Sequence, residues 1–204
     1  MSESALLKVY LLRHGQTAWN ADNNRYCGRT DIPLTEKGLA QAAAVRDQLQ
    51  GVELDAVYTS PLQRASKTAH IASGLEPIVD QRLIEVDFGQ WEYKTREEFV
   101  VEDPLSWEHW DKDPTHVKAG VTGETANEIV TRADDFFKEA YQRHAGQTIL
   151  VAAHNGLNRL YIAYKLGMPL RNYRQLVQHN SAITFFTLNA DGVFTLEYLN
   201  TKLQ

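Results

Sequence analysis

Side chains that can handle a phosphoryl group follow two apolar runs of the sequence. Arg13 and His14 come directly after the run Leu6–Leu12, and His154 comes directly after Thr148–Ala153. A guanidinium group binds phosphate oxygens through paired hydrogen bonds, and a neutral imidazole can attack phosphorus directly. If both runs are strands that lie side by side, the pattern predicts a site for phosphoryl transfer at their carboxyl ends.

A second arginine, Arg64, follows another short apolar segment, Ala56–Thr59. One charge pair about 4 Å apart is worth roughly 4 kcal/mol at an effective dielectric near 20, so two arginines can hold a phosphate dianion without a metal. A single histidine after a strand is more often structural, but two histidines with two arginines favour a shared site. Gly15 and Gly156 each lie within two residues of a histidine. We expect them to let a ligand approach the backbone.

The proton donor that a leaving group needs is predicted at Glu85. This residue sits among apolar neighbours in the segment Arg82–Trp91, and burial favours the protonated form of a carboxyl group. The alternative interpretation is a structural carboxylate that pairs with an arginine.

Metal and nucleotide motifs are missing from the sequence. It contains no HExxH pair, no Cys/His cluster, no EF-hand loop and no Walker A loop. Its lone cysteine, Cys27, excludes an internal disulfide and a CxxC pair. We therefore expect no metal site and no cofactor.

Apolar runs that alternate with helical patterns predict the elements that position these side chains. Strands are expected at Leu6–Leu12, Ala56–Thr59 and Thr148–Ala153, helices at 35–51, 63–73, 129–140 and 156–166, and a terminal hairpin at Ile183–Leu188 and Val193–Leu199. Strand, loop and helix in repeated order are typical of a three-layer α/β fold. The sheet is expected to be mostly parallel, with helices on both faces.

Length and composition predict a single globular domain over residues 1–204. The chain has 21 Lys and Arg against 26 Asp and Glu, a net charge of −5, and 43% hydrophobic residues. This charge disfavours binding to nucleic acid or to an anionic membrane, and no apolar run approaches the roughly 18 residues of a membrane span. Met1–Lys8 lacks the pattern of a signal peptide, so the expected location is the cytoplasm.

The stretch from about 92 to 122 loses the alternating pattern and is predicted to be an insertion or cap. Within it, Glu92–Lys118 carries eight acidic and four basic residues, a net charge of −4. If the cap faces the site, this charge disfavours a second anionic group on the substrate. Its aromatic residues either receive a sugar ring or organic group or form a small core of the cap. They are Tyr93, Phe99, Trp107 and Trp110.

Several sequence blocks resemble the histidine phosphatase superfamily, with its phosphoglycerate mutase-like fold, and in particular its phosphatase branch. The blocks are Arg13–Thr17 with Asn20, Gly28–Gly38, Thr59–Ala65 with Thr68 and Ala69, Leu83–Glu92, Gly123–Thr125, and His154. They span nearly the whole chain, and their order makes the resemblance specific.

The resemblance implies a role for each matched residue. The implied catalytic set is His14 as the phosphorylated nucleophile, Glu85 as the general acid, and Arg13, Arg64 and His154 around the phosphoryl group. The implied binding set adds Asn20, the backbone near Asn155 and Gly156, and the substrate contacts Cys27 and Gly28. Cys27 has an equally good interpretation as a small loop residue.

Three residues depart from the family pattern. Gln16 stands where Glu is common, and Tyr93 and Asn155 stand where Gly is common. All three are expected to border the pocket, which makes the substrates of relatives an unsafe guide. Histidines outside the blocks are expected in surface or structural roles, although His179 and Asn180 lie where they can reach the edge of the site.

The function predicted from these residues is a metal-independent phosphomonoester hydrolase that acts on a small phosphorylated metabolite through a phosphohistidine. One alternative is a phosphoglycerate mutase that depends on 2,3-bisphosphoglycerate, and another is a non-catalytic phosphate-binding regulatory module. A phosphatase of protein phosphohistidine needs an open site, and the insertion argues against it. The outer edge of the terminal hairpin leaves room for a homo-oligomer.

Overall fold

The computed structural model describes residues 5–201, so residues 1–4 of the segment that lacks a signal-peptide pattern lie outside it. Its strands are β1 (Leu7–Arg13), β2 (Ala56–Thr59), β3 (Ile78–Val79), β4 (Thr148–Ala153), β5 (Ile183–Leu188) and β6 (Phe194–Thr201). Its α-helices are α1 (Ala18–Ala21), α2 (Glu36–Gln48), α3 (Gln63–Ser73), α4 (Arg96–Glu102), α5 (Pro104–Lys112), α6 (Ala126–His144) and α7 (Asn155–Lys165). Short 3-10 helices cover Gln81–Leu83, Gly89–Trp91 and Leu170–Gln175.

The strands form one sheet in the order β3-β2-β4-β1-β5-β6. β3, β2, β4 and β1 are parallel, whereas β5 runs antiparallel to β1 and β6 antiparallel to β5. The predicted α/β fold with a mostly parallel sheet is therefore confirmed. Because β4 lies between β1 and β2, the three strand ends that precede the predicted site residues are neighbours.

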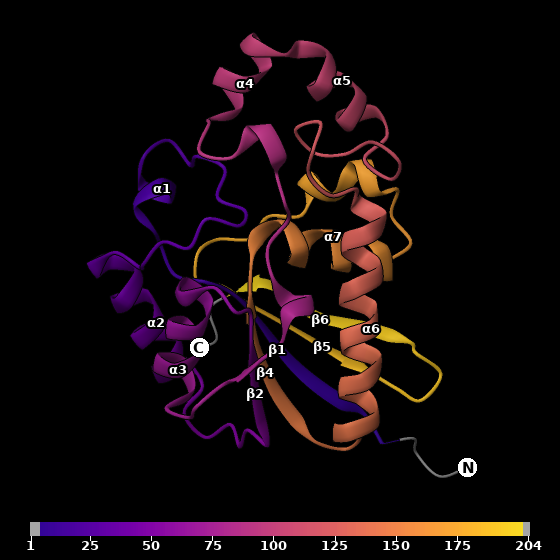
Figure 1. Ribbon diagram of the computed structural model, residues 1–204. Coiled ribbons are helices and arrows are strands. Elements are labelled where there is room, and N and C mark those ends of the chain that lie inside the picture. The colour runs from indigo at the N-terminus through magenta and orange to yellow at the C-terminus, as the bar shows by residue number, and fades with distance from the viewer. Residues whose placement is uncertain (1–4, 202–204) are drawn as a thin grey trace.

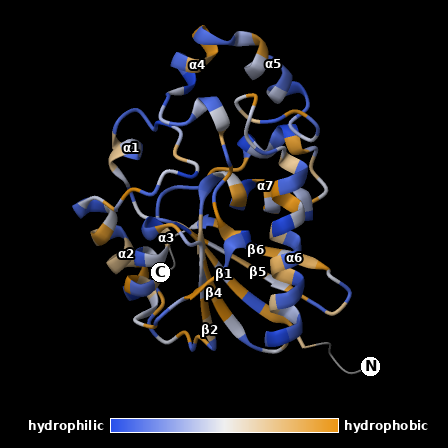
Figure 2. Cartoon of the chain, in the orientation of Figure 1, coloured by the Kyte–Doolittle hydropathy of each residue, from blue (hydrophilic) through white to orange (hydrophobic). Residues whose placement is uncertain are grey.

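Helices cover both faces of this sheet (Figure 1). α2 and α3 pack on one face through residues such as Val45 and Ala69, which meet Leu12 of β1. α6 and α7 pack on the other face, where Ile129 and Leu160 belong to the same buried cluster as alternate residues of β1. Figure 2 shows the hydrophobic strands enclosed between helices whose outer sides are polar.

Side-chain caps fix where two of these helices begin. The hydroxyl of Thr35 accepts a hydrogen bond from the Gly38 N–H and starts α2. Thr125 and Glu128 form a capping box at the start of α6. Each cap satisfies N–H groups that have no partner inside the helix.

The segment 92–122 holds α4 and α5, which lie beyond the carboxyl ends of the strands (Figure 1). Trp91 stacks on Phe99 with ring centroids 4.7 Å apart, and Trp107 and Trp110 pack against Trp91. All four rings are buried. They form a small core of this segment, so the interpretation of Phe99, Trp107 and Trp110 as receptors for an organic group is wrong.

The terminal hairpin is formed by β5 and β6, as predicted, and β6 is an outer strand of the sheet. A homo-oligomer built on this edge stays a prediction. Within residues 5–201, no helix is both long and apolar enough to cross a bilayer.

Candidate active site

A pocket of about 580 Å³, counted to its open mouth, lies at the carboxyl ends of β1 and β4. Arg13 of β1 is paired with Ala153 of β4, so His14 and His154 each follow the last pair of one parallel ladder. Their ring centroids lie 5.2 Å apart. The strand pairing thus brings together two histidines that are 140 positions apart in the sequence.

Predicted site residues form both the lining of this pocket and the layer behind it. Those that line the pocket are Arg13, His14, Asn20, Cys27, Glu85, Asn155 and Gly156. Those that lie behind the lining are Gly28, Arg64 and His154.

His14 is buried and held as a neutral ring. Its Nδ1 lies 2.7 Å from the Gly15 carbonyl oxygen. Because a carbonyl can only accept, Nδ1 carries the proton and Nε2 keeps the free lone pair. Burial, and then the charges of Arg64 and Arg13, lower the pKa of His14 well below its usual value. The ring is therefore uncharged at neutral pH, the form in which an imidazole can act as a nucleophile.

His154 is fully buried, and its orientation is set by Ser60. Nε2 of His154 lies 2.7 Å from the Ser60 hydroxyl, while Nδ1 is buried without a hydrogen-bond partner among the described residues. Burial, and then the charge of Arg64, lower the pKa of His154 well below its usual value. Ser60 was not predicted as a site residue, although it follows β2 directly, the position that drew attention to the two histidines.

Arg13 and Arg64 keep donors free beside the histidines. Arg13 donates from Nη1 to the Gln178 carbonyl, and burial lowers its pKa to about 10, so it stays charged at neutral pH. The Nε–H groups of both arginines are buried and have no partner in the described residues. Buried donors of this kind are rarely left unpaired in a protein, and a bound phosphoryl group can satisfy them.

Arg64 also shapes the loop that follows α1. Its two Nη atoms donate to the backbone carbonyls of Cys27, Gly28 and Thr30. From the opposite side, the Glu92 carboxylate accepts the N–H groups of Gly28 and Thr30. Arg64 and Glu92 thereby hold the two kinds of backbone group of one loop, its carbonyls and its N–H groups. These contacts fix the loop that places Cys27 in the pocket lining.

Cys27 lines the pocket, whereas its contact with a substrate stays a prediction. Its thiol contacts the Thr30 carbonyl at 3.6 Å. Burial raises the pKa of Cys27 to about 12, so the group is a neutral thiol and not a nucleophile.

Glu85 is buried and bound at the start of α7. Its carboxylate accepts hydrogen bonds from the N–H groups of Gly156 and Leu157. It also accepts one from the N–H of the next residue, Val86, and each of the three measures 2.9 to 3.0 Å. These contacts join the Glu85 segment to the helix that follows His154. They also occupy the Gly156 N–H, so the expectation that this group meets the phosphate is wrong.

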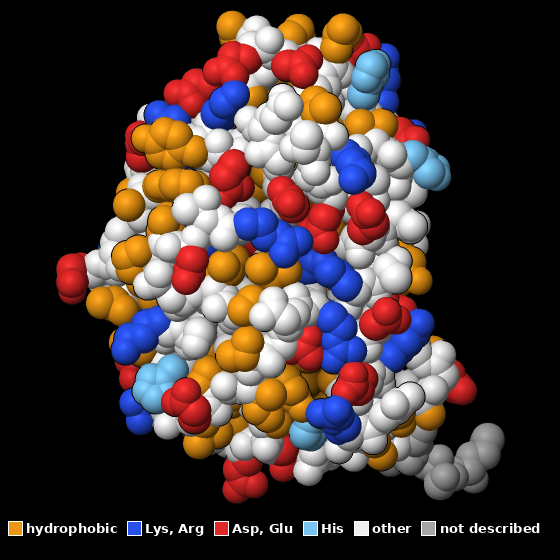
Figure 3. Space-filling view, viewed as in Figure 1, with side chains coloured by type: hydrophobic (Ala, Val, Ile, Leu, Met, Phe, Trp, Pro, Cys, Tyr) orange, Lys and Arg blue, Asp and Glu red, His pale blue; other side chains and the backbone are white. Residues whose placement is uncertain are grey.

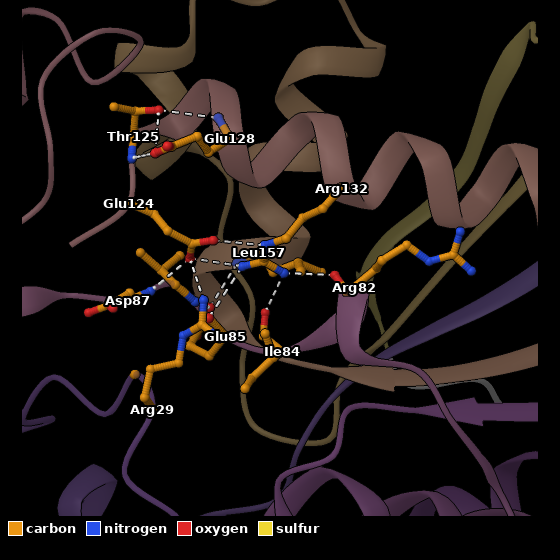
Figure 4. Close-up of polar contacts among 12 residues, drawn as sticks. Arg29, Arg82, Ile84, Glu85, Asp87, Glu124, Thr125, Glu128, Arg132 and Leu157 are labelled. Atoms are coloured by element: carbon orange, nitrogen blue, oxygen red, sulfur yellow. Dashed lines mark hydrogen bonds and ion pairs between the residues drawn. The ribbon is translucent and has the colours of Figure 1, made fainter.

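Arg132 of α6 holds the Glu85 segment from behind (Figure 4). It donates hydrogen bonds to three backbone carbonyls of this segment, those of Arg82, Ile84 and Glu85. Its other donors bind Glu124. Arg132 therefore fixes the backbone that carries the candidate acid without touching the pocket.

Glu124 completes this support. Its carboxylate also accepts the Asp87 N–H and pairs with Arg29 at 2.9 Å. Burial opposes the charge of Glu124, but the hydrogen bonds and charges of Arg132 and its other partners outweigh burial, and its pKa lies below the usual value. The alternative interpretation of an acid paired with an arginine thus describes Glu124 and not Glu85.

Asn20 and Asn180 meet beside His14. Asn180 donates from Nδ2 both to the His14 carbonyl and to Oδ1 of Asn20. Oδ1 of Asn20 also accepts from Thr17. Asn180 thus reaches the edge of the site, whereas no contact of this kind is seen for His179, whose N–H binds Asn200.

The two site glycines make room for the protein itself. A Cβ on Gly15 would lie 2.5 Å from the Gly38 carbonyl, and one on Gly156 would lie 2.8 Å from Oε1 of Glu85. The expectation that they admit a ligand to the backbone needs this correction. Gly15 lets the loop after β1 close on α2, and Gly156 lets Glu85 reach α7.

Two of the three departures from the family pattern lie outside the pocket lining. Gln16 accepts a hydrogen bond from Thr35, and Tyr93 packs against Trp19 with a backbone φ of 68°. That left-handed conformation explains why Gly is favoured at the Tyr93 position. Only Asn155 lines the pocket, where its Oδ1 is buried without a partner in the described part of the chain.

The acidic residues of the 92–122 segment also lie outside the pocket. Glu98 pairs with Arg25, Glu102 with Lys94 and Glu108 with Lys112, and these carboxylates are about half exposed. Figure 3 shows acidic side chains on the outer surface of this part of the molecule. None of these acids lines the pocket, although Glu98 and Asp111 each pair with an arginine that does, so their effect on a second anionic group stays a prediction.

Seven further residues line the pocket and were not predicted, or were not assigned to it. They are Asn24, Arg25, Tyr26, Phe88, Arg159, Tyr173 and Arg174. One signal for Arg159 was present, since it stands four residues after Asn155 on the helix expected there, and residues four apart share a helix face. Across residues 5–201, no group of three or more His, Cys, Asp or Glu side chains is arranged to hold a metal ion.

Known proteins match this chain over most of its length. Residues 9–202 match the histidine phosphatase superfamily (branch 1). Phosphoserine phosphatase 1 of Hydrogenobacter thermophilus is 33% identical over 82% of this chain and 80% of its own length. The solved structure of YhfR from Bacillus stearothermophilus has a TM-score of 0.87 and 33% identity, covering 97% of this chain and all of that one.

A further solved structure carries a phosphate ester. It is a phosphoserine phosphatase mutant from Entamoeba histolytica in complex with phosphoserine, with a TM-score of 0.87, 28% identity, and coverage of 96% of this chain and 98% of that one.

A neutral histidine beside arginines at the ends of parallel strands, in a fold shared with these proteins, defines an enzyme that acts on phosphate esters. The chain belongs to the histidine phosphatase superfamily. It is a phosphatase of that superfamily.

Proposed function

We propose that this phosphatase hydrolyses the phosphomonoester of a small metabolite through a phosphohistidine on His14. The observation that carries the proposal is the hydrogen bond from His14 Nδ1 to the Gly15 carbonyl. It fixes the tautomer whose Nε2 lone pair is free, on a side chain that lines the pocket. The lowered pKa of His14 keeps that lone pair unprotonated at neutral pH.

In the first step, Nε2 of His14 attacks phosphorus, the N–P bond forms and the P–O ester bond breaks. The leaving oxygen takes a proton from the Glu85 carboxyl group. The charges of Arg13 and Arg64 offset the negative charge of the phosphoryl oxygens during transfer.

In the second step, water attacks the phosphohistidine. The O–P bond forms, the N–P bond breaks, and the Glu85 carboxylate takes the proton that the water gives up. Inorganic phosphate and free His14 result. Asn20 and His154 complete the proposed phosphoryl site: Asn20 through its amide, and His154 from behind the nucleophile.

We also propose the domain organisation, the metal requirement and the substrate size of this enzyme. The chain acts as one domain, with the segment 92–122 as its cap. The arginines supply the positive charge of the reaction, so turnover needs no added metal or cofactor. The substrate is a small molecule, since the site is a pocket in which a few polar side chains converge, as is typical of sites for small molecules.

Phosphate release from a panel of phosphorylated metabolites tests the proposal, together with mass spectrometry of protein that is denatured and kept at alkaline pH, where an N–P bond survives. We expect a phosphoryl adduct on the peptide that contains His14 and no turnover by His14→Ala. Turnover by His14→Ala would contradict the mechanism. Isomerisation of 3-phosphoglycerate without phosphate release would indicate a mutase, and binding of phosphate esters without either reaction would indicate a regulatory module.

A further inference from the structure

The charged residues of the pocket are unevenly divided. Its lining holds four arginines and one carboxylate, that of Glu85. Arg13 serves the proposed phosphoryl site, and Arg25 at the pocket mouth is already paired with Asp22 and Glu98, each at 2.7 Å. Two arginines that line the pocket, Arg159 and Arg174, have no part in the proposed phosphoryl transfer.

Arg174 is held rigidly with a donor unused. Its guanidinium lies 4.4 Å from the centre of the Trp107 ring and 4.6 Å from that of Tyr173. Nη2 is buried and has no hydrogen-bond partner among residues 5–201. Among the described residues, its one ion-pair partner is Asp111, 3.8 Å from Nη1 and mostly exposed, and a partner of that kind offsets little charge.

Arg159 approaches the same tyrosine from α7. Its Nε donates to the Tyr173 carbonyl at 3.2 Å, and its guanidinium lies 5.1 Å from the Tyr173 ring. In the described chain, no salt bridge pairs Arg159 with an acid. Burial lowers the pKa of Arg159, and the charge of Arg174 adds to this effect. Tyr173 thus carries two guanidinium groups that repel each other. The one carboxylate of the lining, Glu85, attracts Arg159 but also attracts Arg13, so the arginines of the pocket outnumber their counter-charge.

We propose that Arg159 and Arg174 form a second anion subsite that binds a carboxylate of the substrate. This inference rests on the proposed function, because it assigns the phosphate end of the same molecule to His14. The substrate class is then a phosphomonoester of a small carboxylic acid. A carboxylate is favoured over a second phosphate because it is planar and singly charged, and it matches the few donors that the two stacked guanidinium groups leave free.

The test compares 3-phosphoglycerate with glycerol 3-phosphate, which replaces the carboxylate by a hydroxymethyl group. We expect the wild type to prefer the acid in kcat/KM by about tenfold or more. Arg174→Gln and Arg159→Gln should each remove most of that preference, through KM more than kcat, and change glycerol 3-phosphate hydrolysis less than about twofold. Arg174→Lys keeps the charge but loses the planar fork, and should retain part of the preference.

Arg171→Gln is the matched control. Arg171 lies on the same 3-10 helix, is exposed and does not line the pocket. It undergoes the same change of charge, so a general electrostatic effect would appear there as well. Equal losses on both substrates in the Arg174 and Arg159 variants, or an equal effect of Arg171→Gln, would overturn the subsite.

Failure of the subsite and failure of the proposed function give different results. If the wild type hydrolyses both esters equally, the function stands and the subsite is wrong. Calorimetry can measure the affinity of both esters for the His14→Ala variant and for the double variant His14→Ala/Arg174→Gln, which tests the subsite even without turnover. An affinity for 3-phosphoglycerate that is the same in both variants overturns the subsite. In another outcome, the enzyme has a higher kcat/KM for fructose 1,6-bisphosphate than for fructose 6-phosphate, loses this difference in Arg174→Gln, and shows no preference for 3-phosphoglycerate over glycerol 3-phosphate. That result overturns the assignment to a carboxylate.

Discussion

The Ser60 hydroxyl lies 2.7 Å from Nε2 of His154, and both residues directly follow the strands that end in the site. This contact orients a fully buried imidazole that has no other hydrogen bond from its ring in the described structure. His154 is therefore positioned by the residue that follows the neighbouring strand β2.

Replacing Ser60 by alanine should lower kcat by about tenfold, because a ring that is free to turn no longer presents one nitrogen to the phosphoryl group. The loss in stability should be about 1 kcal/mol, the usual worth of one side-chain hydrogen bond. Steady-state kinetics and urea unfolding measure both quantities. Ser73→Ala, on α3 and away from the pocket, serves as the control, and a kcat that is unchanged in Ser60→Ala refutes the positioning role.

Replacing Glu85 by glutamine should reduce turnover of alkyl phosphates far more than turnover of aryl phosphates, since a phenolate leaves without much help from a proton donor. The variant should also be less stable, because its amide nitrogen faces N–H groups that now need an acceptor. Rates with a series of leaving groups separate the two effects. Equal loss across the series means that Glu85 is not the acid.

Replacing Arg132 by methionine should weaken the same step indirectly. The carbonyls of Arg82 and Ile84 lose their donor, and buried Glu124 loses a partner. We expect a stability loss of about 3 kcal/mol and the same leaving-group dependence as in Glu85→Gln, but smaller. Arg143→Met, in the last turn of the same helix, should change neither. A uniform loss across leaving groups limits Arg132 to a structural role.

Stability should fall as the pH drops below about 6.5. The pKa values of His14 and His154 are both lowered in the folded protein. The unfolded chain therefore binds more protons than the folded chain between the folded values and about 6.5, and each histidine costs about 1.4 kcal/mol per pH unit in that window. Unfolding free energies between pH 5 and 7 measure the slope. His14→Asn should have a shallower slope than the wild type, and identical slopes contradict the prediction.

Removing metal ions should leave turnover unchanged, since Arg13 and Arg64 supply the positive charge that a metal supplies in other phosphatases. Assays in EDTA, followed by addition of Mg²⁺ or Zn²⁺, check this. A strict requirement for an added divalent ion overturns the proposed mechanism.

The parts of the site that lie at strand ends were predictable from the sequence. Runs such as Thr148–Ala153 are apolar on both faces, which is typical of a buried parallel strand. Polar residues that follow such a strand lie at the carboxyl edge of the sheet, where ligands bind in this class of fold. This signal is local, so it located His14, Arg64 and His154 without any knowledge of their partners.

The residues that support or extend the site were not predictable in the same way. Asn180 was expected at the edge of the site only from its place just before the terminal hairpin, and the sequence showed none of its contacts. Arg174 comes from a short 3-10 helix, Leu170–Gln175, that carries no apolar period to mark it. Arg132 is one polar position among many on α6, and its role depends on three carbonyls of a distant loop. The net charge of the 92–122 segment was a poor guide to the pocket for a related reason, because it does not show whether the acidic side chains line it.

The in-register pairing of Arg13 with Ala153 limits how the gene for such an enzyme can change in length. Side chains alternate between the two faces of a strand, so a single inserted or deleted codon in either strand would turn one histidine toward the opposite helical layer. Connections far from the site, such as Gly51–Asp55, are free of this constraint. Insertions and deletions that leave the enzyme active should therefore concentrate in those connections and spare β1 and β4.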